Sequence, residues 1–146
     1  MTASAAPALA PAGLYQDIQQ FYAQQMQALD EGATGQWAAT FTPDGEFAAG
    51  GLPGPVRGRD AIAAGASKIA ADFADRGVQR RHWLGMLTVA PQPGGSVRAR
   101  AYALVLEIPP GGEVAVQRST VCDDELVSAD GGWLVHRRRV TRDGLD

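Results

Sequence analysis

The apolar residues between positions 14 and 29 recur every three or four positions, and glutamine fills the opposite face. This period predicts an amphipathic helix over residues 14–29. Asp30-Glu31-Gly32 ends that helix, and Thr34 is positioned to cap a second, short helix that carries Trp37. Two helices are therefore expected to open the domain.

A third helix is expected to begin at Asp60, with apolar and small residues on one face that indicate close packing. That face holds Ile62, Gly65, Ala66 and Ile69. After Gly77 the pattern changes to long strand-like runs separated by Pro- and Gly-rich turns, namely residues 81–90, 97–108, 114–127 and 133–141. Helices followed by a meander of strands predict an α+β domain with an antiparallel sheet. A pocket is expected where the helices leave the sheet uncovered.

The composition fits one globular domain. A chain of 146 residues with 45% hydrophobic and 20% charged residues can bury one core, and it resembles neither a disordered nor a membrane-spanning protein. The net charge is −3, so no broad basic surface for nucleic acid is expected. Arg137-Arg138-Arg139 lies on a predicted strand, where neighbours alternate in direction, and is interpreted as surface positions with one buried partner.

Cys122 is the only cysteine, so no internal disulfide is possible and nothing indicates an oxidising compartment. With only two histidines beside it, no metal site is expected. Residues 1–12 are rich in Ala and Pro and lack the charged start and long apolar run of a secretory signal. We therefore expect a flexible tail over residues 1–12, a domain over residues 13–146, and a cytoplasmic protein.

The segment that begins with Arg81-His82 has the clearest potential for chemistry. Strand alternation predicts one face with His82, Leu84, Met86 and Thr88 and another with Trp83, Leu87 and Val89. An imidazole titrates near neutrality, so a partly desolvated one beside a carboxylate can exchange protons with a small organic ligand. A histidine on an apolar strand face is also typical of a core or interface residue, and the pattern alone leaves both interpretations open.

The order of elements and four short motifs resemble the SnoaL-like branch of the NTF2-like superfamily. The motifs are Phe41-Thr42-Pro43-Asp44-Gly45, Gly58-Arg59-Asp60-Ala61-Ile62, Arg81-His82 and Gly131-Gly132-Trp133. The likeness covers nearly everything after Gly13. Members of this superfamily form a cone from helices and a curved sheet around a deep pocket, and they include polyketide cyclases, scytalone dehydratase and ketosteroid isomerase. The small subunits of ring-hydroxylating dioxygenases belong to it as well.

The resemblance implies pocket roles for Asp44 and His82, which match the acidic and histidine positions common in SnoaL-like proteins. Asp30 is similar in position to the aspartate of scytalone dehydratase, whereas the second histidine of that enzyme falls near Glu107. The chain departs from the family pattern at Met86, where the family often has Asn.

A second departure lies on the third long strand, where Cys122 and Asp124 stand at positions that are often Tyr and Asp. Independently of the resemblance, Thr120, Cys122 and Asp124 share a strand face and can offer a hydroxyl, a thiol and a carboxylate to a ligand. The alternatives are a solvated Asp124 near a strand end and a Cys122 that is only a small buried hydrophobe. Tyr15 and Tyr22 lie seven residues apart on the first helix, where they line either a pocket or the core.

Two functions of different classes follow. The first is a dehydratase, cyclase or isomerase that needs no cofactor and acts on a hydrophobic polyketide-type or aromatic molecule, with His82 as acid/base and Asp44 or Asp30 as its partner. The second is a non-catalytic protein that binds a small molecule or accompanies a catalytic subunit. A homodimer is expected in both cases, because Trp83, Leu87 and Val89 offer an apolar sheet face. His136 is expected at the surface or at a subunit interface.

Overall fold

The structure is a computed structural model, and it describes residues 9–145. Most of the expected tail over residues 1–12 lies outside the described residues, and Ala12 already belongs to the first helix. The elements in chain order are α1 (Ala12–Asp30), α2 (Thr34–Ala38), β1 (Phe41–Ala49), β2 (Val56–Arg57), α3 (Arg59–Arg76), β3 (Gln79–Pro91), β4 (Val97–Ile108), β5 (Ala115–Ala129) and β6 (Gly132–Arg142).

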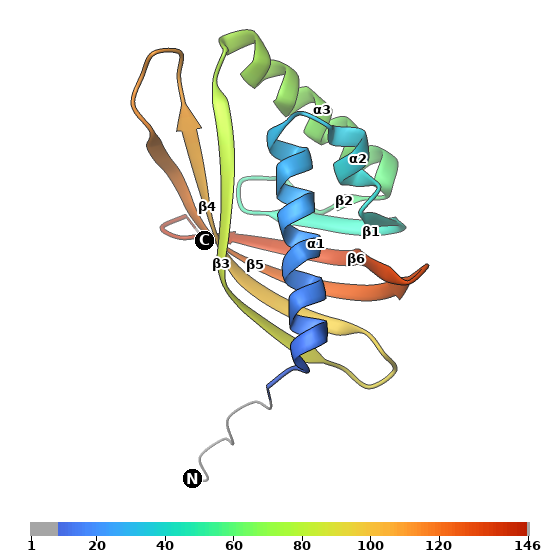
Figure 1. Cartoon of the computed structure of the whole chain (residues 1–146). Coiled ribbons are helices and arrows are strands. Elements are labelled where there is room, and N and C mark those ends of the chain that lie inside the picture. The colour runs from blue at the N-terminus through green and yellow to red at the C-terminus, as the bar shows by residue number, and fades with distance from the viewer. Residues whose placement is uncertain (1–8, 146) are drawn as a thin grey trace.

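The predicted α+β class is confirmed, and the sheet contains both antiparallel and parallel strand pairs. Its strand order is β2-β1-β6-β5-β4-β3 (Figure 1). The meander β3 to β6 is antiparallel as expected, but β1 pairs with β6 in parallel. The reason is topological, because α3 carries the chain from β1 and β2 to the far edge of the sheet before the meander returns. The sequence pattern showed only a short apolar segment at β1.

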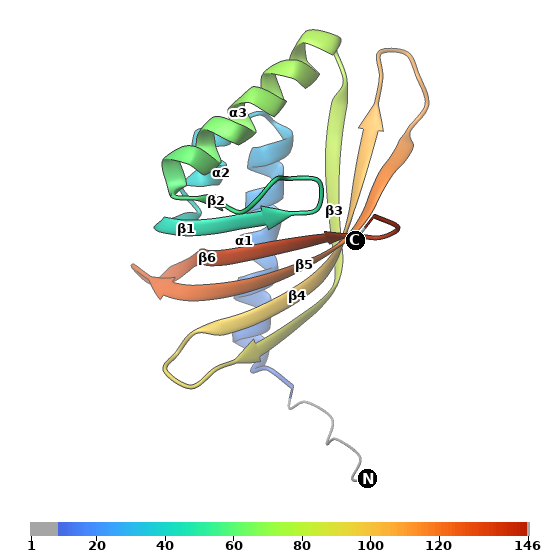
Figure 2. The same cartoon turned by 180° about the vertical axis from the view of Figure 1, so that it is seen from behind.

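All three helices lie on one side of the curved sheet, and the opposite side is uncovered (Figures 1 and 2). The core lies between α1 and the sheet and includes Ile18, Phe41, Leu126 and Val135, each with an exposed fraction of 0%. α1 buries Ile18, Tyr22 and Met26, as its period predicted, and also Gln25. Within residues 9–145, no helix has the length and apolar character needed to cross a membrane.

Three irregularities bend the long strands. The register shifts between Gly85 and Thr88 in β3, between Val105 and Leu106 in β4, and between Glu125 and Leu126 in β5. Such bulges increase the local twist and curve a sheet. At the first of them Met86 has φ 53°, a left-handed conformation that is uncommon for a residue other than glycine.

The motif Gly58-Arg59 ties the start of α3 to β1. Gly58 has φ 92°, a conformation that suits glycine, and its N–H donates to the carbonyl of Gly45 at 2.7 Å. The Arg59 guanidinium donates through Nε to the carbonyl of Phe41 at 2.9 Å. The prediction that Thr34 caps α2 is wrong, because Thr34 is the first residue inside the helix. Its hydroxyl forms a hydrogen bond of 2.7 Å with the hydroxyl of Ser67.

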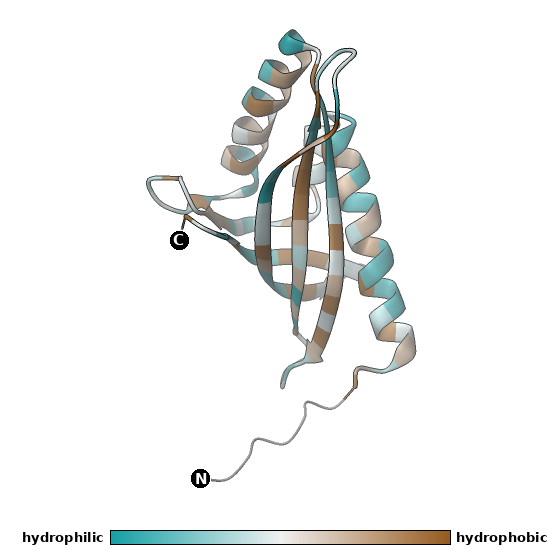
Figure 3. Cartoon of the chain, turned by 90° about the vertical axis from the view of Figure 1, so that its left-hand side faces the viewer, coloured by the Kyte–Doolittle hydropathy of each residue, from teal (hydrophilic) through white to brown (hydrophobic). Residues whose placement is uncertain are grey.

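The bulge in β3 also changes which residues face outward. Trp83 is exposed as expected, but Leu87 and Val89 turn inward and join the core, so their prediction as surface residues is wrong. Large exposed hydrophobic residues instead gather on β3, β4 and β5, namely Trp83, Met86, Tyr102, Leu104 and Val116. Figure 3 looks onto these strands from the side, where hydrophobic residues alternate with hydrophilic ones.

Candidate functional site

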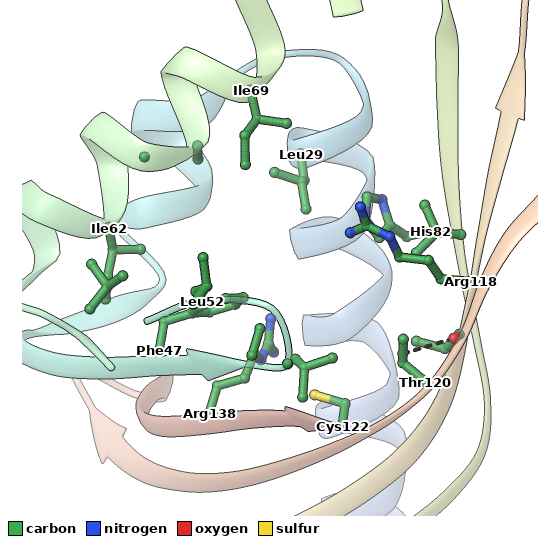
Figure 4. Close-up of a pocket in the computed structure, with 18 of the residues that line it drawn as sticks. Leu29, Phe47, Leu52, Ile62, Ile69, His82, Arg118, Thr120, Cys122 and Arg138 are labelled. Atoms are coloured by element: carbon green, nitrogen blue, oxygen red, sulfur yellow. Dashed lines mark hydrogen bonds between the residues drawn. The ribbon is translucent and has the colours of Figure 1, made fainter. Parts of the chain in front are cut away.

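A cavity of about 400 Å³ lies between the helices and the sheet. This volume falls within the range of roughly 300–1,000 Å³ that is usual for small-molecule pockets. Most of its walls are apolar, with contributions from α1, α3, β1 and the long strands, and they include Met26, Leu29, Phe47, Ile62 and Leu84. The polar side chains that line it are His82, Thr120, Arg80, Arg118, Arg138 and Arg142. Figure 4 shows His82, Arg118, Thr120 and Arg138 among them.

Asp30 holds His82 through two contacts. The His82 ring lies with Nδ1 2.6 Å from Asp30 Oδ1, and its backbone N–H donates to Asp30 Oδ2 at 3.1 Å. Both side chains are largely buried, with exposed fractions of 14% for His82 and 6% for Asp30. Asp30 is the last residue of α1, where the helix dipole disfavours a negative charge. The negative charge of Asp30 is therefore stabilised by its two contacts with His82, and these contacts fix the orientation of the imidazole.

The same geometry determines the state of the second ring nitrogen. A carboxylate accepts hydrogen bonds, so Nδ1 of His82 carries the proton and donates it to Asp30. In the neutral ring Nε2 then bears a free lone pair. The His82 side chain lines the cavity and is 14% exposed. His82 thus presents a proton acceptor to whatever the cavity holds.

A second, deeper network surrounds Asp124. Arg138 donates to this carboxylate from Nε at 2.9 Å and from Nη2 at 2.8 Å, and Nη2 also donates to Gln25 Oε1 at 2.7 Å. The Tyr22 hydroxyl donates to Asp124 Oδ2 at 2.6 Å. Burial, and next to it the Asp124 carboxylate, raise the pKa of Tyr22, so the phenol stays protonated.

Arg138 connects this network to the cavity. Burial alone lowers the pKa of Arg138, but the Asp124 carboxylate more than offsets that effect and the pKa is raised, so the guanidinium stays charged. Its Nη1 makes no hydrogen bond with any described residue and is not fully buried, and Arg138 lines the cavity. The guanidinium is therefore a fixed donor held in place from behind.

The model of the SnoaL-like domain matches residues 12–139, which is most of the chain. The chain belongs to the SnoaL-like domain family. Aln2 from a Streptomyces species is 36% identical, with 94% of this chain and 96% of that one covered and a TM-score of 0.87. ActVI-ORFA from Streptomyces coelicolor is also 36% identical, with 93% and 99% covered and a TM-score of 0.83.

A third similar structure carries a ligand. The protein from Catenulispora acidiphila, solved in complex with S-DNPA, is 40% identical, with 91% of this chain and 96% of that one covered and a TM-score of 0.78. No curated protein matches the sequence. The expected resemblance is therefore confirmed at the level of family and fold.

In this SnoaL-like domain the structure brings Asp30, and not Asp44, to His82. The Asp44 side chain is 82% exposed, and its Oδ1 lies 3.7 Å from Nδ1 of His136. His136 also lies 3.2 Å from the Thr42 hydroxyl, and neither His136 nor Asp44 lines the cavity. Position 44 follows Pro43 at the rim of β1, so its side chain points to solvent.

Met86 does not line the cavity, so its prediction as a pocket residue is wrong. Its exposed fraction is 77%, because the bulge between Gly85 and Thr88 reverses the alternation after Leu84. His82 and Leu84 precede the bulge and do line the cavity. Strict alternation fails here because one residue in left-handed conformation shifts every following side chain to the other face.

The other predicted ligand contacts divide into two groups. Thr120 and Cys122 line the cavity, and the Thr120 hydroxyl donates to the carbonyl of Ala103 at 2.9 Å. Tyr22 and Asp124 lie behind the wall in the buried network. Tyr15 packs against the core cluster. Glu107 pairs in register with Arg80 and lies outside the cavity lining.

The face of α3 that was expected to pack closely does so at Ile62 and Ala66, which belong to the buried core cluster, and the same face lines the cavity. Ala61, Ile62, Gly65, Ala66 and Ile69 all contribute to it. A Cβ atom built on Gly65 meets nothing within 4 Å, so the glycine reflects open space and no tight contact. Among residues 9–145, no group of three or more His, Cys, Asp or Glu side chains is placed to hold a metal ion.

The arginines of the cavity were not predicted as site residues. Arg80, Arg118 and Arg142 stand at strand ends, where a charged side chain normally indicates only solvent. One buried arginine was expected within Arg137-Arg138-Arg139, and it is Arg138. The sequence indicates its place in the cavity, because strand residues two apart share a face and Val140 lines the same cavity. Gln25 was also missed, although its place seven residues after Ile18 and three after Tyr22 puts it on the buried face of α1.

Cys122 is expected to react at least about a hundredfold more slowly with a disulfide reagent at pH 8 in the folded protein than after denaturation. Burial raises the pKa of Cys122 to about 12, with Arg138 acting against burial and Asp124 acting with it. The reactive thiolate is therefore scarce at pH 8. Release of thionitrobenzoate from Ellman's reagent, followed with and without denaturant, measures this. Equal rates would show that the thiol is open and activated.

Proposed function

We propose that this protein is a cofactor-independent dehydratase, cyclase or isomerase that acts on a hydrophobic, oxygen-bearing ring molecule of polyketide or aromatic type. The observation that carries the proposal is the His82–Asp30 pair, with Nδ1 at 2.6 Å from the carboxylate and the His82 side chain lining a largely apolar cavity. The SnoaL-like family and the ligand in the Catenulispora acidiphila relative support a small-molecule function.

The reaction begins with Nε2 of neutral His82 taking a proton from a carbon or hydroxyl group of the ligand. Asp30 stabilises the imidazolium that forms, because its carboxylate accepts a hydrogen bond from Nδ1–H, with the nitrogen 2.6 Å from Oδ1. The imidazolium then returns the proton. Return to a departing hydroxyl group releases water, which is dehydration, whereas return to another carbon is isomerisation. General acid–base catalysis of this kind contributes about a hundredfold to ten-thousandfold in rate.

Arg138 supplies the complementary charge. Removing a proton beside a carbonyl group leaves negative charge on the oxygen, and a preorganised donor in a dry site stabilises that charge. Arg138 Nη1 is the candidate, because the Thr120 hydroxyl already donates its proton to the carbonyl of Ala103. Figure 4 shows Arg138 at the end of the cavity that also holds Thr120 and Cys122. The apolar walls exclude water and hold the ring.

Deuterium uptake by 2-tetralone in D₂O tests this proposal. This neutral bicyclic ketone has exchangeable protons beside its carbonyl group, and proton NMR follows their loss. The wild-type protein is expected to accelerate exchange above the rate in buffer, and 2-tetralone is expected to protect the protein against thermal unfolding. Acceleration without such binding would place the chemistry outside the cavity.

The second candidate is a protein that binds a small molecule without transforming it. It is favoured by the scarcity of proton donors and acceptors, since His82 is the one histidine among the residues that line the cavity and Cys122 is protonated at neutral pH. Binding of 2-tetralone with an exchange rate equal to that in buffer would favour this candidate over the enzyme.

We also propose that the exposed strand face pairs two copies of the chain. Trp83 is 70% and Tyr102 is 54% exposed, and Trp83 stands opposite Leu104 in the register. Trp83→Glu is expected to weaken the dimer by about tenfold or more, because aromatic residues dominate such contacts. Sedimentation velocity measures this, with Leu145→Glu as the matched exposed control. A wild-type protein that sediments as a 15.3 kDa monomer at micromolar concentration would contradict the dimer.

A further inference from the structure

The charges around the cavity differ from those of the whole chain. The chain has a net charge of −3, yet the side chains that line the cavity include four arginines and His82, and none of the described lining residues is Asp or Glu. In an apolar cavity, charge of one sign raises the local concentration of ligands of the other sign. The proposed proton-transfer reaction does not by itself require this excess of positive side chains around the cavity.

Five of the twelve arginines have carboxylate partners among the described residues. Arg57 and Arg137 pair with Glu46, Arg76 with Asp72, Arg100 with Asp123, and Arg138 with Asp124. The Arg118 side chain makes no hydrogen bond or ion pair with any described residue, and, unlike Arg81, Arg98 and Arg139, which also make none, it lines the cavity. Figure 4 shows its side chain reaching toward His82. A guanidinium that lines a cavity without a partner is free to bind an anion there.

Arg80 is the second positive group at this end of the cavity. Its guanidinium lies 4.3 Å from the centre of the Phe73 ring, which holds it in place. Burial lowers the pKa of Arg80; Asp30 and Glu107 act against this, whereas the positive charge of Arg118 acts with it. The carboxylates of Asp30 and Glu107 lie near Arg80, but no carboxylate within residues 9–145 pairs with Arg118. One negative charge on a bound ligand would neutralise the positive charge of Arg118.

The exposed lining residues show where such a ligand enters. Gly51, Leu52, Ala61, Gly65, Ile69 and Arg118 line the cavity and are exposed. They surround a mouth between α3, the loop after β1 and the start of β5. Arg118 therefore stands at the mouth, and His82, with a 14% exposed side chain, stands farther inside. An acidic ligand would meet Arg118 first and place its ring beyond it.

From this arrangement we propose that the ligand is a carboxylic acid, whose carboxylate binds Arg118 and Arg80 at the mouth while its apolar ring occupies the interior. A planar guanidinium matches a carboxylate with two parallel hydrogen bonds. The inference rests on the proposed function only for the position of the ring beside His82. The carboxylate fixes the position of that ring, so Arg118 is a specificity-determining residue and takes no part in proton transfer.

Calorimetric titration with three matched probes tests the inference, namely 2-naphthylacetic acid, its methyl ester and 2-naphthyl phosphate. The acid is expected to bind about tenfold or more tightly than the ester, because one charge-assisted hydrogen-bond pair is lost in the ester. Arg118→Gln should remove this preference and leave the affinity for the ester unchanged. Arg139→Gln, an exposed arginine outside the cavity lining, is the control and should change neither affinity.

Three results would overturn the inference: equal binding of acid and ester, no binding of the acid, or tighter binding of the phosphate than of the acid. They would leave the proposed function standing, because 2-tetralone is neutral and its exchange does not depend on a carboxylate. Conversely, acid-selective binding without any 2-tetralone exchange would support the anion site and contradict the enzyme.

Discussion

His82→Ala is expected to slow protein-catalysed deuterium uptake by 2-tetralone by about a hundredfold to ten-thousandfold, which is the usual contribution of a general acid–base group. Proton NMR in D₂O measures the rate. The fold is expected to remain, because the removed ring lines a cavity that already exists and the additional cavity cost is small. The largely buried Asp30 carboxylate keeps the backbone N–H of residue 82 but loses the imidazole, so the unfolding temperature is expected to fall. A lost exchange rate measured well below the unfolding temperature of the variant would separate chemistry from stability.

Two conservative substitutions sharpen this result. Asp30→Asn keeps the shape but removes the carboxylate that fixes Nδ1, and it should lower the exchange rate by more than about tenfold. Asp44→Asn is the matched control, because Asp44 is exposed and lies beside His136, so the rate should not change. Equal losses in both variants would point to a general electrostatic effect and against a specific pair.

Asp124→Ala is expected to lower the free energy of unfolding by about 3–5 kcal/mol, because it leaves the buried Arg138 charge without its carboxylate. The substitution also removes the acceptor of the Tyr22 hydroxyl. Urea unfolding followed by circular dichroism measures the change. Both side chains of the pair are almost fully buried, with exposed fractions of 4% and 0%, so solvent offers little compensation.

Asp123→Ala provides the neighbouring control on the same strand. Asp123 pairs with Arg100 at 3.2 Å, but both side chains are exposed, and such surface pairs contribute about 0–1 kcal/mol. A loss in Asp124→Ala no larger than in Asp123→Ala would contradict the structural importance assigned to the buried network.

The sequence predicted the elements better than their pairing. The helical period over residues 14–29 and the strand runs after Gly77 correspond to α1 and to β3 through β6 within a few residues. The parallel contact of β1 with β6 was not predictable from local patterns, because it joins segments that are distant in the chain. The Gly58-Arg59 motif becomes physically clear only in the fold, where Arg59 binds the carbonyl of Phe41.

The sequence predicted only part of the candidate site, because local patterns do not show bulges or contacts between distant segments. Alternation correctly placed His82 and Leu84 on one face, but it failed at Met86 because a bulge cannot be read from residue types alone. Asp30 and Asp44 were equal candidates in the sequence, and only the packing of α1 against β3 distinguishes them. Arginine is usually a surface residue, so no pattern marked Arg118 as part of a cavity.

The central claim is that a ring molecule binds in the cavity with a reactive carbon beside His82. A crystal structure of the protein with 2-tetralone bound at saturating concentration tests it most directly. The ring is expected between α3 and the sheet, with the carbonyl group or the carbon next to it within about 3.5 Å of His82 Nε2. A ketone bound outside the cavity, or bound inside it with both groups beyond the reach of Nε2, would contradict the account.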